Sequence, residues 1–170
     1  QEFYPQRMNY PMILEEEAVT SWENLLKASY KDIENKIERD KPELDGKTAV
    51  CGMDMASLND FASAGFLFKN EKEYIWIHKT WICSNGRFFN DIKFPFHLAG
   101  EYGYTDFEVV DTPTIPEDEV ISWVIEQMSK YNVKRIRMDT YQFKLYRKTF
   151  EKYGITEYHE KNNPNGQLEM

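Results

Sequence analysis

Long apolar runs, paired cysteines and an excess of basic residues are all missing from this 170-residue sequence. No run approaches the ~20 apolar residues of a membrane helix, and the N-terminus lacks a signal pattern, so we expect a cytoplasmic protein with no membrane partner. The two cysteines, Cys51 and Cys83, lack CxxC spacing, which argues against a structural zinc site. A net charge of -8 excludes a protein that coats nucleic acid by bulk electrostatics.

Three familiar kinds of site are also missing. The sequence has no GxxxxGK[ST] phosphate loop, so we predict no nucleotide-binding residues. His78, His97 and His159 form no i, i+4 pair, which argues against a histidine metal site. Ser57 and Ser63 have no nearby histidine, so a serine hydrolase is not supported.

The length and the composition, 41% hydrophobic and 15% aromatic, predict one domain with a sizeable core. We place this domain at residues 47–170 and an N-terminal extension with a helical linker at 1–46. Within the extension, Thr20–Glu23 has the form of a capping box that opens a helix, and 31–47 reads as a polar helix followed by a turn at Asp45-Gly46. Because the sequence starts at Gln1 and breaks off without a closing element, we expect a piece of a longer polypeptide.

Two strand-like runs each deliver one carboxylate at their exit. The run from Val50 ends its apolar part at Asp54, and the run from Val133 ends at Asp139. A buried strand seldom carries an acid without a matching partner. If the two strands are neighbours, the acids converge at one sheet edge, and a divalent metal would relieve their repulsion. The pattern therefore indicates a metal-dependent phosphoryl-transfer site.

The order of the predicted elements is strand, strand, strand, helix, strand, helix, strand. The segments are Thr48–Ala56, Phe61–Phe68, Tyr74–Ile82, Glu117–Tyr131, Val133–Met138, Gln142–Tyr153 and a last strand from Ile155. An irregular stretch occupies 85–116, and Gly154 is placed to end the second helix. We therefore predict an α/β fold with an RNase H-like mixed sheet. Its first three strands are antiparallel, the later ones are parallel, and helices flank it.

Two side-chain patterns in the predicted strands bear on packing. The small residues 62–65 indicate that something packs very close to the second strand. Trp76, Trp81 and Trp123 recur at the spacing of core residues, and we interpret all three as packing residues.

Basic residues gather around the second acid. The segment from Lys130 to Lys152 contains eight basic residues and only two acidic ones, Asp139 and Glu151. Strand alternation sends only some of this charge towards a ligand, so Lys144, Arg147 and Lys148 on the predicted helix are the best phosphate contacts, with Arg137 on the strand beside Asp139. A solvated helix face is the alternative explanation of the same charges.

The residues around both acids resemble the nuclease domain of the large terminase subunit of tailed double-stranded DNA phages. That family's first strand reads Gly-x-Asp-x-Ser/Ala-Ser-x-x-Asp-x-x-Ala. This sequence matches it at Gly52, Asp54, Ala56, Ser57 and Asp60, with Ser63 near the usual Ala. The likeness runs from Arg7-Met8-Asn9 and Trp22, through Leu44–Lys47, to Arg137-Met138-Asp139, and so covers most of the chain.

The resemblance implies an endonuclease that cuts concatemeric double-stranded DNA during packaging in a bacterial host cell. Asp54 and Asp139 would hold two Mg²⁺ or Mn²⁺ ions, with Asp54 bridging both and Asp60 as an outer-shell partner or a turn-capping residue. The small terminase subunit and the portal would be partners. The family's third carboxylate comes from well beyond the second, so we expect the domain to be C-terminally incomplete, with this ligand after Met170.

Two other functions fit parts of the pattern. A non-catalytic DNA-binding or assembly module, a truncated prophage remnant, would keep the fold without the third acid. An actin-like or sugar-kinase ATPase also carries Gly-x-Asp on its first strand, but it has a Gly where this chain has Ala56 and needs two such domains.

Overall fold

The computed structural model describes residues 20–32, 35–55, 61–71, 73–86, 89–92, 96–101, 103–156, 159–160 and 167–169. The chain divides into two compact units, Gln1–Glu43 and Leu44–Met170. No helix in the described part of the chain is long and apolar enough to span a membrane.

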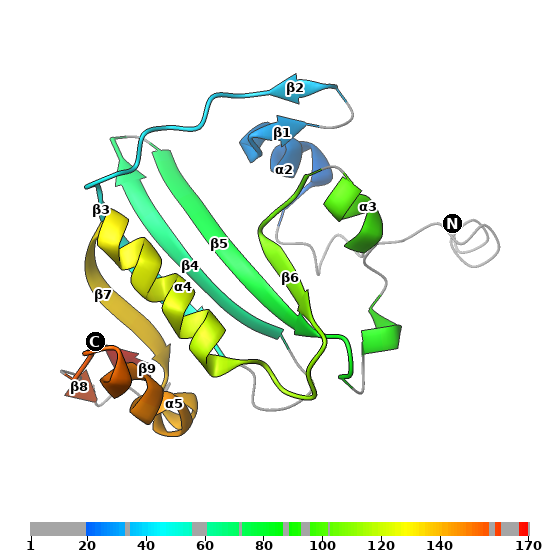
Figure 1. Ribbon diagram of the computed structural model, residues 1–170. Coiled ribbons are helices and arrows are strands. Elements are labelled where there is room, and N and C mark those ends of the chain that lie inside the picture. The colour runs from blue at the N-terminus through cyan, green and yellow to red at the C-terminus, as the bar shows by residue number, and fades with distance from the viewer. Residues whose placement is uncertain are drawn as a thin grey trace. The chain divides into compact units, whose positions relative to one another are not determined.

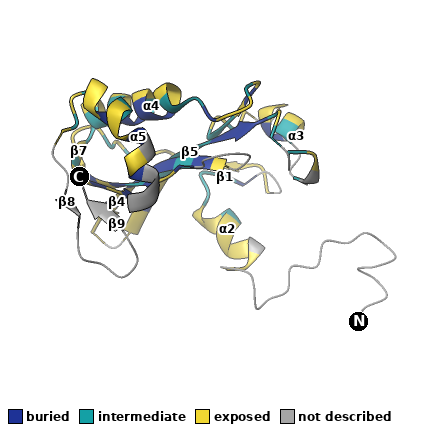
Figure 2. Cartoon of the chain, turned by 90° about the horizontal axis from the view of Figure 1, so that it is seen from below, coloured by how far each residue is buried: buried dark blue, intermediate teal, exposed yellow. Residues whose placement is uncertain are grey.

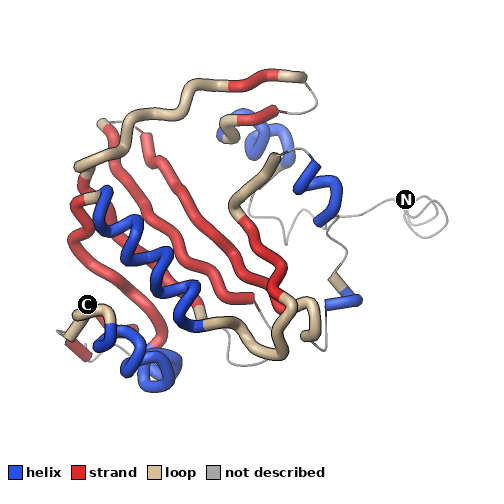
Figure 3. Tube along the Cα trace, in the orientation of Figure 1, coloured by secondary structure: helices blue, strands red, loops and turns tan. Residues whose placement is uncertain are grey.

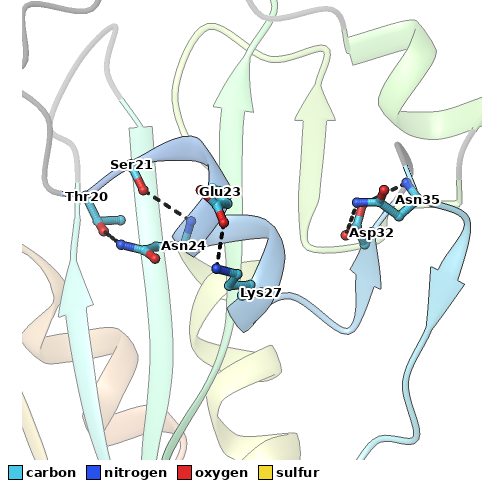
Figure 4. Close-up of polar contacts among 7 residues, drawn as sticks. All are labelled: Thr20, Ser21, Glu23, Asn24, Lys27, Asp32 and Asn35. Carbon is cyan, nitrogen blue, oxygen red and sulfur yellow. Dashed lines mark hydrogen bonds and ion pairs between the residues drawn. The ribbon is translucent and has the colours of Figure 1, made fainter.

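The first unit contains a short, well-capped helix, α2, at Trp22–Ala28. The Ser21 side chain accepts a hydrogen bond from the Asn24 backbone N–H, and the Asn24 amide donates to Thr20 Oγ1 at 3.2 Å (Figure 4). The Lys27 ammonium group forms an ion pair with Glu23, one turn earlier, with 2.6 Å between Nζ and Oε1. The predicted helix start is confirmed, since hydroxyl side chains satisfy backbone donors that the first turn leaves free.

The polar helix predicted within 31–47 is wrong. The described part of this segment instead holds a small antiparallel ladder of β1, Lys31–Asp32, and β2, Ile37–Glu38. Asp32 accepts hydrogen bonds from both the backbone and the side chain of Asn35, at 3.0 and 2.9 Å (Figure 4). Such a side-chain turn competes with helix formation. The predicted turn at Asp45-Gly46 is confirmed, with Gly46 at φ 72°.

The second unit is built on a seven-stranded sheet in the order β6-β5-β4-β3-β7-β9-β8 (Figure 1). The strands are β3 Thr48–Asp54, β4 Phe61–Asn70, β5 Glu73–Cys83, β6 Phe107–Val110, β7 Asn132–Asp139, β8 His159–Glu160 and β9 Gln167–Glu169. Strands β3, β4 and β5 form an antiparallel meander, while β7 runs parallel to β3. This mixed sheet with flanking helices confirms the predicted RNase H-like fold. The last strands depart from the predicted parallel arrangement, because β9 pairs antiparallel with both β7 and β8.

Two helices and one face of the sheet enclose the core. Helix α4, Glu117–Lys130, begins with three acids that suit its positive N-terminus and buries Val120, Ile121 and Val124. Its one aromatic residue, Trp123, packs against the sheet, with its ring centroid 5.7 Å from those of both Phe66 and Trp81. Helix α5, Thr140–Lys152, follows β7 directly. Figure 2 shows both helices on the same side of the sheet, with the buried positions between.

Two predictions for the irregular parts of the chain need correction. The stretch 85–116 contains the 3-10 helix η1, Phe89–Asp91, the helix α3, Phe96–Glu101, and strand β6, which pairs parallel with β5 (Figure 3). Four residues of strand carry too little periodicity to be recognised. Residues 155 and 156 form no strand; after them, the described part resumes as β8 at His159.

The end of α5 gives a first test of the backbone conformation. Gly154 follows the helix at φ 84°, as predicted for a helix stop. A side chain there is strained, so Gly154→Ala should lower the free energy of unfolding by about 1–2 kcal/mol. Gly100→Ala, inside α3 with open space around it, should be neutral or raise it by about 0.5–1 kcal/mol. Urea denaturation of both variants measures this, and equal effects would contradict the assignment.

Candidate functional site

Two carboxylates from distant parts of the sequence end neighbouring parallel strands. Asp54 is the last residue of β3 and Asp139 is the last residue of β7. The last paired residues of the ladder are Gly52 and Arg137, so each acid lies two residues further along its own strand. Both carboxylates are exposed, and both line one open cleft of about 520 Å³. The predicted convergence of the two strand ends is therefore present in the structure.

A register shift between β3 and β7 brings the two acids level. Ala49 pairs with Val133, but the next residue, Val50, pairs with Arg135, so Lys134 is an extra residue in β7. Side chains alternate between the two faces of a strand, and one residue of slip moves a whole set to the other face. The extra residue therefore keeps buried Cys51 beside buried Ile136. It places Asp54 and Asp139 on the same, exposed face.

Residues of this exposed face form rows across the strands, on the side away from the aromatic core. The rows are Asp54, Ser63 and Thr80; Arg137, Gly52, Gly65 and His78; and Arg135, Val50, Leu67 and Trp76. In the first row, Ser63 Oγ and Thr80 Oγ1 share a hydrogen bond of 2.9 Å. Ser63, directly opposite Asp54 on β4, therefore adds a hydroxyl oxygen to the carboxylate-lined cleft, and Thr80 on β5 holds that hydroxyl.

Trp76 is an exposed wall of the cleft, and its interpretation as a packing residue is wrong. Its side chain is 50% exposed, and its ring lies nearly parallel to that of His78, at 17° with centroids 6.3 Å apart. The benzene part of the indole fills the space above Gly65, because a Cβ added at Gly65 would overlap it. The predicted close approach to the second strand is thus the approach of this ring. Trp81, in contrast, is buried and packs edge-on against Trp123.

The predicted basic contacts fall in different environments. Arg137 lines the cleft together with the two acids. Lys144 and Lys148 are exposed on α5. Arg147, on the same helix, bonds Glu151 at 2.7 Å, so that its charge is shared with a neighbouring acid.

The chemistry available at the cleft is that of oxygen ligands and a guanidinium group. Within the described residues, no three His, Cys, Asp or Glu side chains come close enough together to hold a metal ion. Asp60, the predicted outer-shell partner, lies outside the described residues. Two carboxylates nevertheless suit Mg²⁺, which commonly takes one or two protein carboxylates and completes its shell with water and substrate phosphate oxygens.

The cysteines beneath this face are not suited to nucleophilic chemistry. Burial raises the pKa of the Cys51 thiol to about 12, and it also raises the pKa of the Cys83 thiol. Only the thiolate is a good nucleophile, and a raised pKa keeps the thiol protonated at neutral pH. Neither thiol therefore supplies a nucleophile to the cleft at neutral pH.

Sequence reasoning found the acids but missed Trp76 and Ser63 as parts of the same cleft, together with the hydrogen bond between Ser63 and Thr80. The missing information was the β4–β5 register, which pairs Ser63 with Thr80 and Leu67 with Trp76. Parity along each strand offered a signal, because Trp76, His78 and Thr80 must share a face. It did not indicate which face is covered by helices.

Comparison with known proteins shows the fold. No family model and no curated protein matches the sequence. The crystal structure of the HK97 bacteriophage large terminase matches with a TM-score of 0.54 and 12% sequence identity over 67% of this chain. The matched part of this chain spans 25% of the length of the terminase chain. The predicted terminase-like, RNase H-like fold is confirmed.

The two glycines of the cleft give a matched test of its geometry. Gly65→Ala must displace the Trp76 ring and should destabilise the unit by about 1–3 kcal/mol. Gly52→Ala meets nothing within 4 Å and should be neutral or slightly stabilising, because alanine loses less backbone entropy on folding. Urea denaturation measures both variants. A neutral Gly65→Ala would mean that the indole does not occupy this position.

Proposed function

We propose that this domain is a divalent-metal-dependent endonuclease that hydrolyses double-stranded DNA, as the nuclease part of a phage DNA-packaging terminase. The observation that carries the proposal is the pair Asp54 and Asp139, level on neighbouring parallel strands and lining one cleft. The terminase-like fold supports the packaging context, including the small terminase subunit and the portal as partners.

The donor set fits Mg²⁺ or Mn²⁺, with Asp54 and Asp139 as the protein ligands. Bound there, two such ions would activate a water molecule and stabilise the leaving oxygen of a phosphodiester. Neighbouring strands of a sheet lie about 4.8 Å apart. Carboxylates carried at the ends of two such strands repel each other when the cleft holds no cation. Arg137 lowers the negative potential of the cleft and offers a donor to a phosphate oxygen.

The positive charge needed to hold DNA comes from α5 and the strand before it. Lys144 and Lys148 are exposed on the helix that starts directly after Asp139. We propose that a DNA backbone at the two acids extends past the end of β7 to these lysines, because α5 begins where β7 ends. Such local contacts are compatible with a net charge of -8, because affinity for DNA depends on the phosphates contacted rather than on the overall charge.

A non-catalytic DNA-binding or assembly module is the second candidate. It is favoured by one observation, that the described residues bring only two carboxylates to the cleft and no third metal-binding group. The two candidates share the DNA surface. They differ in whether the protein cleaves DNA, and in the nuclease this cleavage requires Asp54 and Asp139. Substitution of the acids therefore distinguishes the two candidates.

Replacing either strand-end acid should abolish cleavage. Asp54→Asn and Asp139→Asn should each lower the rate of plasmid nicking in Mn²⁺ by more than about 100-fold, since even outer-shell partners of a metal cost 10- to 100-fold. Glu73→Gln, an exposed acid on β5 at the other end of the sheet, is the control and should cut like the unmodified protein. Nicking that survives both aspartate substitutions would refute the assigned site, and no nicking by any form would favour the binding module.

Lys144 and Lys148 on α5 should contribute to the affinity for DNA but not to the cleavage step. Lys144→Gln with Lys148→Gln should weaken DNA binding and reduce the slope of log K against log salt by roughly two, one for each phosphate that is no longer neutralised. Lys47→Gln with Lys69→Gln makes the same change in net charge at exposed positions of the same unit and should leave the slope nearly unchanged. Fluorescence anisotropy at several salt concentrations measures both. Equal slopes for the two double variants would mean that α5 is only a solvated face.

A further inference from the structure

The floor of the cleft is bare, and one aromatic side chain overhangs it. Gly52 and Gly65 pair directly across β3 and β4 on the exposed face. These two glycines contribute no side chains and form a trough between the row of Asp54 and the row of Trp76. Trp76 reaches into it from β5, since its indole occupies the space above Gly65. The trough thus has carboxylates along one side and an aromatic ring along the other.

The position of Trp76 is fixed although its side chain is half exposed. The ring is stacked on His78, and His78 Nε2 in turn lies 3.8 Å from Asp106 Oδ2. A large aromatic side chain held in place at the surface presents apolar area without losing further rotamer freedom when a ligand binds. Such preorganised rings serve as platforms for flat ligands, and bases stack on them whatever their sequence.

We propose that Trp76 stacks an unpaired base of the DNA strand that lies in the cleft. The preferred substrate is then DNA with locally unpaired nucleotides beside the cleavage site. This inference rests on the proposed function and narrows its substrate class. In an intact duplex the base faces are covered by their neighbours, so a side chain can stack on a base only where the stack is opened.

The spacing of the sheet agrees with this role. Gly65 lies one strand and two residues away from Asp54, which is roughly 8 Å at 4.8 Å per strand and 3.4 Å per residue. Successive phosphates of one DNA strand are about 3.4 Å apart along the helix axis. The base on the indole therefore belongs to a nucleotide about two or three steps from the phosphate at the carboxylates.

The composition of the cleft favours a nucleic acid over an apolar protein segment. Val50 and Leu67 continue the row of Trp76 and are partly exposed, which alone would suit either ligand. The same cleft, however, is lined by Arg137 and two carboxylates. A guanidinium for phosphate and a ring for the base match the two parts of a nucleotide, whereas an apolar segment would bury charged side chains against apolar ones.

The test measures binding of the 170-residue chain to three DNA probes in EDTA, where no cleavage occurs. The probes are a paired duplex, the same duplex with two unpaired nucleotides, and the second probe with abasic sites at those nucleotides. The protein should bind the probe with unpaired bases about 5- to 150-fold more tightly than the abasic one, the range measured for one stacked base. The abasic probe has the same length and phosphate charge and lacks only the bases, so this ratio measures their contribution.

Variants assign the ratio to one ring. Trp76→Ala should bring the ratio to about one, and Trp76→Phe should keep part of it because a ring remains. Tyr74→Ala removes a 68% exposed aromatic side chain from the same strand, outside the cleft lining, and should keep the full ratio. Circular dichroism confirms that each variant is folded. If Trp76→Ala does not fold, the inference is tested by the ratios of binding to the unpaired and the abasic probe in the unmodified protein and in Trp76→Phe.

Three results would overturn the inference. They are a ratio of one in the unmodified protein, an unchanged ratio in Trp76→Ala, and no binding to any probe. Its failure is distinguishable from failure of the nuclease proposal. A ratio of one with cleavage that depends on Asp54 removes only the stacking role, whereas a Trp76-dependent ratio without cleavage in Mn²⁺ removes only the nuclease.

Discussion

The parallel pairing of β3 with β7 is the constraint on which the site depends. It joins strands that lie 84 positions apart at Thr48 and Asn132. Backbone hydrogen bonds fix where both strands begin, from Gly46 to the Lys130 carbonyl at 2.8 Å and from Asn132 to the Lys47 carbonyl at 2.9 Å. The extra residue Lys134 then changes the offset so that the acids come level. A pairing made so far along the chain has to recover a large loop-closure entropy, which the helix packing supplies.

One face of the sheet forms the core that stabilises the fold, and the other face carries the residues of the candidate site. The first face holds Cys51, Phe66, Phe68 and Ile136, which are buried. Trp123 of α4 packs on this face, and Tyr131, which follows α4, meets Phe68 edge-on at 4.9 Å between ring centroids. The other face carries carboxylates, hydroxyls and Trp76. Substitutions on the exposed face therefore change ligand binding more than folding, except at Gly65, where the ring above leaves no space. This division makes conservative site variants informative.

The long elements and the acid pair could be predicted from the sequence because each has a local signal. Strand β3 alternates buried and exposed positions, and α4 repeats apolar residues at helical spacing. The rest depends on contacts that no local pattern encodes. Strand β6 is four residues long, the β1–β2 ladder depends on one Asp32 side chain, and the level of the two acids depends on a shift at Lys134. Trp76 was assigned to the wrong face because period-2 alternation does not say which face is covered.

The central claim is that residues from two distant strand ends form a single metal site, and paramagnetic Mn²⁺ tests it most directly. In an amide NMR titration at substoichiometric Mn²⁺, the signals of Met53 to Met55 and of Met138 to Thr140 should broaden together, at the same metal concentration. Asp54→Asn should abolish broadening in both segments, including the one it does not belong to. Broadening confined to one segment, or centred on residues away from both strand ends, would contradict the account.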